Sequence, residues 1–124
     1  SLENDDMIAS TFYNLGIVYT ANSERSLARE AYLRALTIQP DLVNARYNLA
    51  LIYLEEKDLA SAVKVLEDVT KTNPSHAPAH FALGLIYSSA PSSYGQARDH
   101  YQQFLKLAPN DPSAGRAKRW LDAH

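Results

Sequence analysis

The sequence predicts an all-α protein, an α-solenoid in which helical pairs stack one after another. A seven-residue segment recurs three times at a constant interval, as YNLGIVY at 13–19, YNLALIY at 47–53 and FALGLIY at 81–87. Apolar residues around these segments follow the three- and four-residue spacing of helices, and no stretch alternates long enough to form a strand. A unit of two helices cannot bury both of its apolar faces alone, so about three units must stack to make a core.

Length and composition exclude several classes of protein. The 124 residues are 46% hydrophobic and 21% charged, which predicts one folded domain over residues 1–124 rather than a disordered chain. The net charge of −2 gives no basic surface for nucleic acid or anionic membranes, and no apolar run is long enough to insert across a membrane. The absence of cysteine excludes disulfides, thiolate metal sites and cysteine nucleophiles. The chain does not begin with Met, and we expect it to be a piece of a longer protein.

The three repeats cover about residues 9–42, 43–76 and 77–111, and each is predicted to hold two helices. The predicted helices are Ile8–Ala21, residues 24–38, Leu42–Glu56, Leu59–Thr72, Ala77–Ser89 and Tyr94–Leu107. Side-chain oxygens before the helices can accept their first backbone N–H groups. The predicted caps are Asp5 or Asp6, Asp41, Asp58, Ser75 and Ser93. A proline stops the second helix of each repeat, at Pro40, Pro74 and Pro109, because proline fixes φ and lacks an N–H.

Two segments depart from the strict repeat. The third repeat is one residue longer between Tyr87 and Ala97, where a Ser-, Pro- and Gly-containing stretch predicts a longer loop. After it, Pro112 suits the first turn of a seventh helix, which we interpret as a capping helix over residues 112–124. Its apolar residues are expected to cover the third repeat and its charged residues to face water. The apolar residues are Ala114, Trp120 and Leu121, and the charged residues are Arg116, Lys118 and Arg119.

The pattern of small, aromatic and proline positions resembles the tetratricopeptide repeat family. In the first repeat the matching residues are Phe12, Leu15, Gly16, Tyr19, Ala28, Tyr32, Ala35 and Pro40. The second and third repeats depart by placing Arg46 and His80 where Phe12 stands. The resemblance implies a right-handed superhelix with a concave groove lined by the first helix of each repeat. It also implies a non-catalytic scaffold that binds a peptide segment or a partner protein in that groove.

The faces of the first helix in each repeat locate a candidate groove. One face is expected to pack on the second helix, and a flank with Thr11 and Val18, matched by Ala45 and Ile52, to meet the next repeat. Apolar residues on the face left over are informative, because internal packing does not need them. The candidate ligand-binding residues are Tyr13, Asn14, Ile17, Asn44, Tyr47, Asn48, Leu51, Phe81 and Leu85. The alternative is that a tightly wound superhelix packs the apolar members against one another.

Two asparagines on this face, Asn14 and Asn48, occupy the same position in the first and second repeats. A carboxamide can pair with both polar groups of a peptide backbone. Some members of the family use such an asparagine ladder. Here Ala82 occupies the equivalent position of the third repeat, so the ladder would have two members. The alternative is that both asparagines are solvated surface residues. A family subgroup binds chaperone C-terminal carboxylates through a clamp of Lys, Asn and Arg, of which Asn48 alone matches. A carboxylate needs cationic partners when it is desolvated, so we do not expect binding of chaperone tails.

No combination of residues predicts catalysis, a metal or a cofactor. His76 and His80 are four residues apart, but no HExxH motif and no third ligand accompanies them, so we expect structural or solvated roles. No Ser-His-Asp arrangement, phosphate-binding glycine loop or carboxylate pair can be argued from the sequence. We therefore expect no enzyme, and the sequence leaves the localisation open.

Charge is separated along the chain. Acidic residues gather near the start of the chain, at Glu3, Asp5 and Asp6. Basic residues gather near its end, at Arg116, Lys118 and Arg119. Acids at a helix start are favoured by the helix dipole alone, and the alternative is head-to-tail self-association. Two hypotheses thus stay open beside the binding scaffold: a homo-oligomerising scaffold, and an accessory module of a larger assembly or enzyme.

Overall fold

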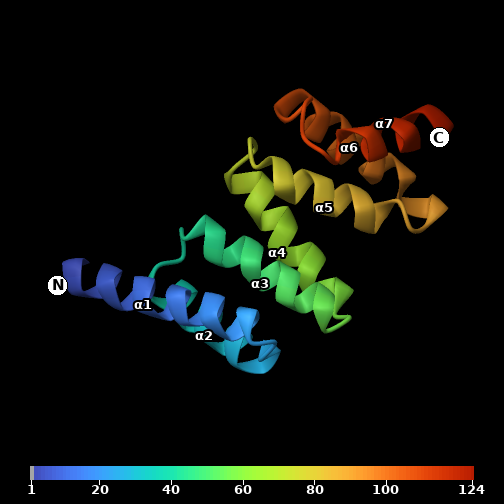
Figure 1. Cartoon of the computed structure of the whole chain (residues 1–124). Coiled ribbons are helices and arrows are strands. Elements are labelled where there is room, and N and C mark those ends of the chain that lie inside the picture. The colour runs from blue at the N-terminus through green and yellow to red at the C-terminus, as the bar shows by residue number, and fades with distance from the viewer. Residues whose placement is uncertain (1) are drawn as a thin grey trace. The chain divides into compact units, whose positions relative to one another are not determined.

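The computed structural model describes residues 2–124, which form seven α-helices and one 3-10 helix and contain no strand (Figure 1). The elements are α1 (Leu2–Ala21), α2 (Arg25–Ile38), α3 (Val43–Glu55), α4 (Leu59–Thr72), α5 (Ala77–Tyr87), η1 (Pro91–Ser93), α6 (Tyr94–Leu107) and α7 (Ala114–Ala123). The all-α class is confirmed. The chain divides into two compact units, Ser1–Val65 and Leu66–His124, with the boundary inside α4. The repeat boundaries and the single domain over 1–124 stay predictions.

The starts of α1 and α7 and the capping residue of α5 differ from the predictions. The helix α1 starts at Leu2, so Asp5 and Asp6 lie inside it rather than capping it, because no helix-breaking residue precedes Ile8. The cap of α5 is His76 and not Ser75, since His76 Nδ1 accepts the Ala79 N–H at 3.1 Å. The helix α7 starts at Ala114 and excludes Pro112. There the Asp111 carboxylate accepts the Ser113 N–H at 2.8 Å and holds a turn instead.

The remaining predicted caps divide into one confirmed and two wrong. Asp58 Oδ1 accepts the Ser61 N–H at 3.2 Å, as expected of a capping side chain. Asp41 does not cap α3, whose capping position is held by Leu42 without a side-chain bond. Ser93 occupies the capping position of α6, but its side chain accepts no helix N–H; its hydroxyl donates to the Tyr87 carbonyl oxygen at 2.8 Å.

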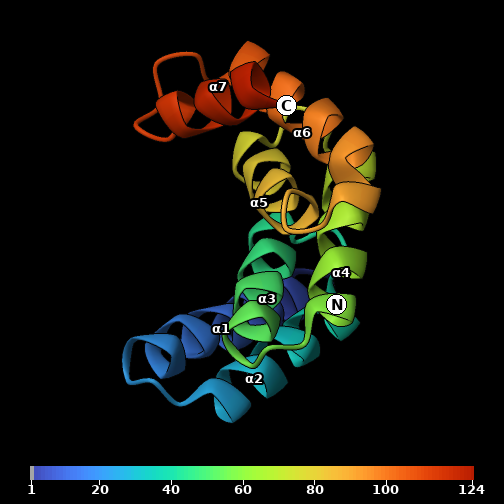
Figure 2. The same cartoon turned by 90° about the vertical axis from the view of Figure 1, so that its right-hand side faces the viewer.

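In the N-terminal unit, α1 and α2 form an antiparallel pair and α3 lies against α2 (Figures 1 and 2). Gly16 lets the pair approach, because a Cβ at this position would lie only 2.5 Å from the Tyr32 ring. Burial of apolar surface in a cluster from α2 and α3 stabilises this unit. The cluster consists of Ala28, Tyr32, Ala45, Leu49 and Ile52. Two ion pairs, Arg25 with Glu55 and Arg29 with Glu56, join the start of α2 to the end of α3.

The packing of α3 corrects one sequence-based expectation. Ala45 and Ile52, expected to face the next repeat, lie in the cluster with Ala28 and Tyr32 of the preceding repeat. Sequence periodicity shows which residues share a helix face, but it does not show which neighbour that face meets. The matching residue Val18 on α1 is 53% exposed.

In the C-terminal unit, α5 and α6 form a pair and α7 packs on α6 (Figure 2). A Cβ on Gly84 would lie 2.5 Å from the buried Tyr101 ring, repeating the relation of Gly16 to Tyr32. Ala114 and Ala117 of α7 share a cluster with Tyr101 and Phe104, and Trp120 and Leu121 pack against it. Arg116, Lys118 and Arg119 are exposed. The expected division of α7 into a covering face and a solvated face is therefore confirmed.

Candidate functional site

A cavity of about 330 Å³ opens between α1 and α3 on the N-terminal unit. Its wall residues come from the first helices of the first two repeats and from α2. They are Ile17, Thr20, Ala21, Tyr32, Asn48, Leu51, Ile52 and Glu55. The structure thus brings together Ile17, Asn48 and Leu51, three of the candidate residues. We call this the α1–α3 cavity.

The chemistry of the α1–α3 cavity is mainly apolar. Ile17, Leu51 and Ile52 supply aliphatic surface. Asn48 Nδ2 lies 3.5 Å from the Tyr32 hydroxyl oxygen, a long hydrogen bond that leaves most of the carboxamide's bonding capacity for other partners. The Glu55 carboxylate at the wall accepts from Arg25 Nε at 2.9 Å. The cavity therefore suits an uncharged apolar side chain with a polar backbone group beside it.

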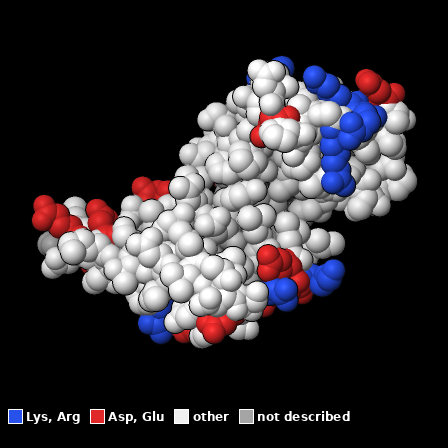
Figure 3. All heavy atoms as spheres, viewed as in Figure 1, with Lys and Arg blue, Asp and Glu red and all other residues white. Residues whose placement is uncertain are grey.

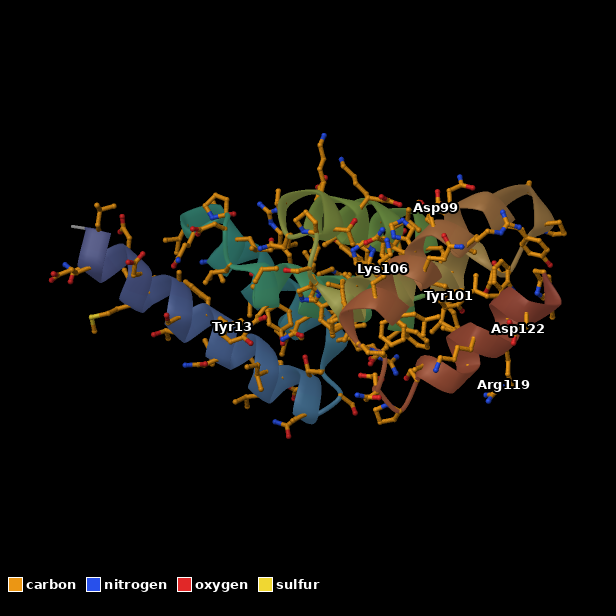
Figure 4. All side chains as sticks on the ribbon, turned by 90° about the horizontal axis from the view of Figure 1, so that it is seen from above. Tyr13, Asp99, Tyr101, Lys106, Arg119 and Asp122 are labelled. Carbon is orange, nitrogen blue, oxygen red and sulfur yellow. The ribbon has the colours of Figure 1, made fainter. Side chains whose placement is uncertain are left out.

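A second cavity of about 190 Å³ lies at the start of α3. Tyr13 of α1 and Asn44 of α3, both candidate residues, line it together with Asp41, Leu42, Val43 and Ala45. The Tyr13 ring is half-buried on the side of α1 that faces α2 and α3, 6.1 Å from the Tyr32 ring (Figure 4). One turn of helix separates Tyr13 from Ile17 and Asn44 from Asn48, so the two cavities follow one another along α1 and α3.

The other candidate residues lie outside both cavities. Asn14 is exposed on α1, and Tyr47 is half-buried on α3, where burial raises the pKa of its phenol. Phe81 and Leu85 belong to the C-terminal unit and pack against its core. The Phe81 ring centroid lies 4.9 Å from that of Phe104. Internal packing therefore accounts for part of the Phe81 and Leu85 surfaces, and their place in a groove stays a prediction.

The sequence prediction omitted Thr20, Ala21 and Glu55 from the site. The periodicity did carry a signal for all three. Thr20 shares a helix face with Ile17, and Ala21 and Glu55 are equivalent positions of the first two repeats, one turn beyond Ile17 and Leu51. Tyr32 and Ile52 could not be found in this way, because they are also core residues of the unit.

The histidines of the C-terminal unit have structural contacts. His80 is buried, and its Nε2–H donates to the Pro74 carbonyl oxygen at 2.8 Å. Its Nδ1 therefore accepts from His100 Nδ1–H at 3.0 Å. His100 Nε2 lies 3.5 Å from Glu67, which also accepts from the Tyr87 hydroxyl at 2.6 Å. Among residues 2–124 no three His, Asp or Glu side chains gather as metal ligands.

Two of these histidines should make stability depend on pH. Burial lowers the pKa of His100, although the Glu67 carboxylate partly raises it, and burial also lowers the pKa of His76. The native state therefore binds fewer protons than the unfolded state. The contribution of the two neutral histidines to the free energy of unfolding is fully present above the ordinary histidine pKa of 6.5. It is lost as the pH falls through their lowered folded-state pKa values.

We expect the thermal midpoint, followed by circular dichroism, to fall between about pH 7 and about pH 5. His76→Asn should reduce this dependence, because asparagine can cap α5 and does not titrate. His124→Asn, at an exposed position, is the control. An equal reduction in both variants would contradict the role of His76.

Solved structures with similar folds were found over nearly the whole chain. The first TPR domain of Spaghetti (RPAP3), bound to the HSP90 peptide SRMEEVD, superposes with a TM-score of 0.84 at 20% identity, covering 95% of this chain and 94% of that one. The TPR domain of Arabidopsis OM64 gives 0.85 at 18% identity, covering 97% and 98%. YrrB, described as a TPR protein with an unusual peptide-binding site, gives 0.78 at 24% identity, covering 90% and 57%.

No helix among residues 2–124 has the length and apolar character needed to cross a membrane.

Two sequence relatives and one family profile also match the chain. The chain is 30% identical over 110 residues to Protein O-mannosyl-transferase Tmtc3 of Drosophila melanogaster, covering 89% of this chain but 12% of the fly protein. It is 39% identical over 72 residues to Uncharacterized protein ycf37 of Pyropia yezoensis, covering 58% of this chain and 40% of that protein. The chain thus spans less than half the length of these relatives. The tetratricopeptide repeat profile matches residues 20–86, more than half of the chain, and the chain therefore belongs to the tetratricopeptide repeat family.

Proposed function

We propose that this chain is a non-catalytic scaffold that binds an extended peptide segment along α1 and α3. The observation that carries the proposal is the α1–α3 cavity, an apolar hollow that holds Ile17 and Leu51 beside the Asn48 carboxamide. A ligand side chain of leucine or isoleucine size would bury its apolar surface there, while Asn48 pairs with the ligand backbone. Peptide binding by the first TPR domain of Spaghetti (RPAP3) supports the same use of the fold.

The charge of the cavity walls indicates which peptides fit. Neither cavity along α1 and α3 is lined by Lys or Arg, whereas Glu55 and Asp41 line one each. An acidic segment such as SRMEEVD would find no Lys or Arg side chain in either cavity lining to offset the desolvation of its carboxylates. We therefore infer a neutral, apolar ligand segment, with Asn14, Asn44, Tyr47, Phe81 and Leu85 as further predicted contacts.

The test is a peptide-library selection on the wild-type chain followed by calorimetric titration of a selected peptide. Ile17→Glu should weaken binding at least tenfold, about 1.4 kcal/mol or more, because it places a charge in the apolar wall. Asn48→Ala should cost about 1 kcal/mol, the usual net worth of a neutral hydrogen bond. Added salt should change the affinity little, since an apolar contact is not screened.

A matched control separates the cavity from general effects of a surface charge. Leu33 on α2 is 42% exposed, close to the 43% of Ile17, and lines neither cavity along α1 and α3. Leu33→Glu should leave the affinity unchanged. Equal loss in Leu33→Glu and Ile17→Glu, or binding that disappears at high salt, would place the site elsewhere.

A second candidate role is that of an accessory interaction module within a longer enzyme. The similarity to Protein O-mannosyl-transferase Tmtc3, which covers 89% of this chain, favours it. Such a module binds a protein and leaves the chemistry to another part of the polypeptide. Assay of the isolated chain for mannosyl transfer should then give no activity, while the peptide binding remains.

A further inference from the structure

Equivalent positions in the first two repeats differ sharply in exposure. On α3, Leu49 and Ile52 are 3% and 1% exposed because they pack in the cluster with α2. Their equivalents on α1, one repeat earlier, are Leu15 and Val18, which are 37% and 53% exposed. The same helix stripe is thus an interior surface in the second repeat and an open surface in the first.

Exposed apolar residues are frequent on α1 and continue onto the start of α2. Of eleven exposed large apolar side chains among the described residues, six lie on α1, and three of these, Ile8, Leu15 and Val18, belong to this open surface. A cavity of about 200 Å³ on this side is lined by Phe12, Leu15, Tyr19, Leu27, Glu30, Ala31 and Arg34. The helical rotation of 100° per residue places Ile8, Phe12, Val18 and Tyr19 within about 60° of Leu15, and it places Ile17 on the opposite side of α1. We call this surface, formed by those five α1 residues and Leu27, the α1–α2 face.

The α1–α2 face is close to electrically neutral. The charged residues in the lining of its cavity are Glu30 and Arg34, an i, i+4 pair in which Arg34 Nε lies 3.7 Å from Glu30 Oε1. The Arg34 guanidinium is 5.7 Å from the Phe12 ring centroid. A partner surface therefore needs to be apolar and needs no net charge. Single exposed leucines are common on proteins, but a stripe that is interior in the next repeat is not explained in that way.

The last helix along the chain offers no matching surface. The exposed side chains of α7 include Arg116, Lys118, Arg119 and Asp122, and Arg119 and Asp122 project from α7 in Figure 4. Figure 3 likewise shows Lys and Arg side chains gathered near the C-terminal helices and acidic ones at the start of α1. Stacking α7 on the α1–α2 face would bury these charges against apolar surface, which is unfavourable without partners. The other exposed large apolar residues lie outside the α1–α2 face; they are Leu2, Met7, Ile17, Leu33, Ile38, Leu59 and Leu107.

We propose that the α1–α2 face binds the α1–α2 face of a second copy of this chain. Two identical neutral apolar faces related by a two-fold axis complement each other and form a closed dimer. The contact would cover Leu15 and Val18 much as α2 covers Leu49 and Ile52. Because Ile17 lies on the opposite side of α1, the α1–α3 cavity stays open in such a dimer.

The test is sedimentation velocity over protein concentrations up to roughly 1 mM, in low and high salt. The wild type should pass from monomer to dimer and stop there, and high salt should not dissociate the dimer, since burial of apolar surface is not screened. Val18→Glu and Leu15→Glu should shift the dissociation constant upward by at least tenfold. Ile17→Glu and Leu33→Glu, matched in exposure, should leave it unchanged.

Circular dichroism on each variant shows whether the helices remain folded, and Val18→Glu, at the more exposed position, is the variant least subject to misfolding. A wild type that stays monomeric throughout would overturn the proposal. Oligomers larger than a dimer that dissociate at high salt would overturn the proposal and would favour head-to-tail association through α7. A folded Val18→Glu that dimerises like the wild type would exclude the α1–α2 face.

Discussion

Removal of residues 112–124 is expected to destabilise the chain by about 3–5 kcal/mol, the usual cost of losing a large buried aromatic contact. The helix α7 contributes Ala114 and Ala117 to the cluster that buries Tyr101 and Phe104, and the Trp120 ring centroid lies 5.4 Å from that of Tyr101. Without α7 this side of α6 would be exposed, and aggregation should increase. Thermal denaturation of the intact and truncated chains measures the loss.

Two variants keep this prediction testable if the truncated chain aggregates. Ala117→Glu buries a carboxylate at a position with no exposed surface and should also destabilise strongly. Replacement of Arg116, Lys118 and Arg119 by Ala changes only the exposed side of α7 and should have little effect. A truncated chain that melts within about 2 °C of the intact one would show that α7 does not act as a cap.

Gly84→Val is expected to destabilise the C-terminal unit by about 3 kcal/mol, at the upper end of the usual cost of overpacking. The added Cβ would lie 2.5 Å from Tyr101 Cδ1, and Tyr101 is fully buried, so its ring cannot move away without disturbing α6. Gly95→Val is the matched control, because a Cβ at Gly95 meets nothing within 4 Å. Chemical denaturation of both variants gives the two free energies of unfolding.

The second repeat suggests how a side chain at position 84 can be accommodated. At the positions equivalent to Gly84 and Tyr101, the second repeat carries Ala50 and Leu66. A leucine in place of the tyrosine leaves room for a side chain on the facing helix. Gly84→Ala combined with Tyr101→Leu should therefore be more stable than the sum of the single changes predicts. Strict additivity would contradict a direct clash between the two positions.

The sequence was sufficient for the helices because their apolar periodicity and proline positions are local signals. Helix starts were less predictable: Asp5 and Asp6 can cap a helix or lie in its first turns, and nothing before Ile8 ends α1. The cap of α5 is His76, whose hydrogen bond from the Ala79 N–H depends on the fold of the preceding loop. Histidine is not among the residue types that usually cap helices, so the sequence carried no signal for it.

The candidate site could be predicted only in part. The repeat period placed Ile17, Asn48 and Leu51 on one face of α1 and α3, and the structure brings these three into one cavity. The repeat period did not indicate which neighbour the stripe with Val18 and Ile52 packs against. These two residues occupy equivalent positions, but Ile52 is buried against α2 and Val18 is exposed. Only packing between helices decides which of two equivalent faces is interior.

Methyl and amide shift mapping by NMR, during titration with a selected apolar peptide, tests the central claim most directly. Binding in the α1–α3 cavity predicts that the largest shifts arise from the Ile17, Leu51 and Ile52 methyl groups and the Asn48 side-chain amide. Shifts that leave these signals unchanged and concentrate on Leu15, Val18 and Leu27, or on α7, would contradict peptide binding along α1 and α3.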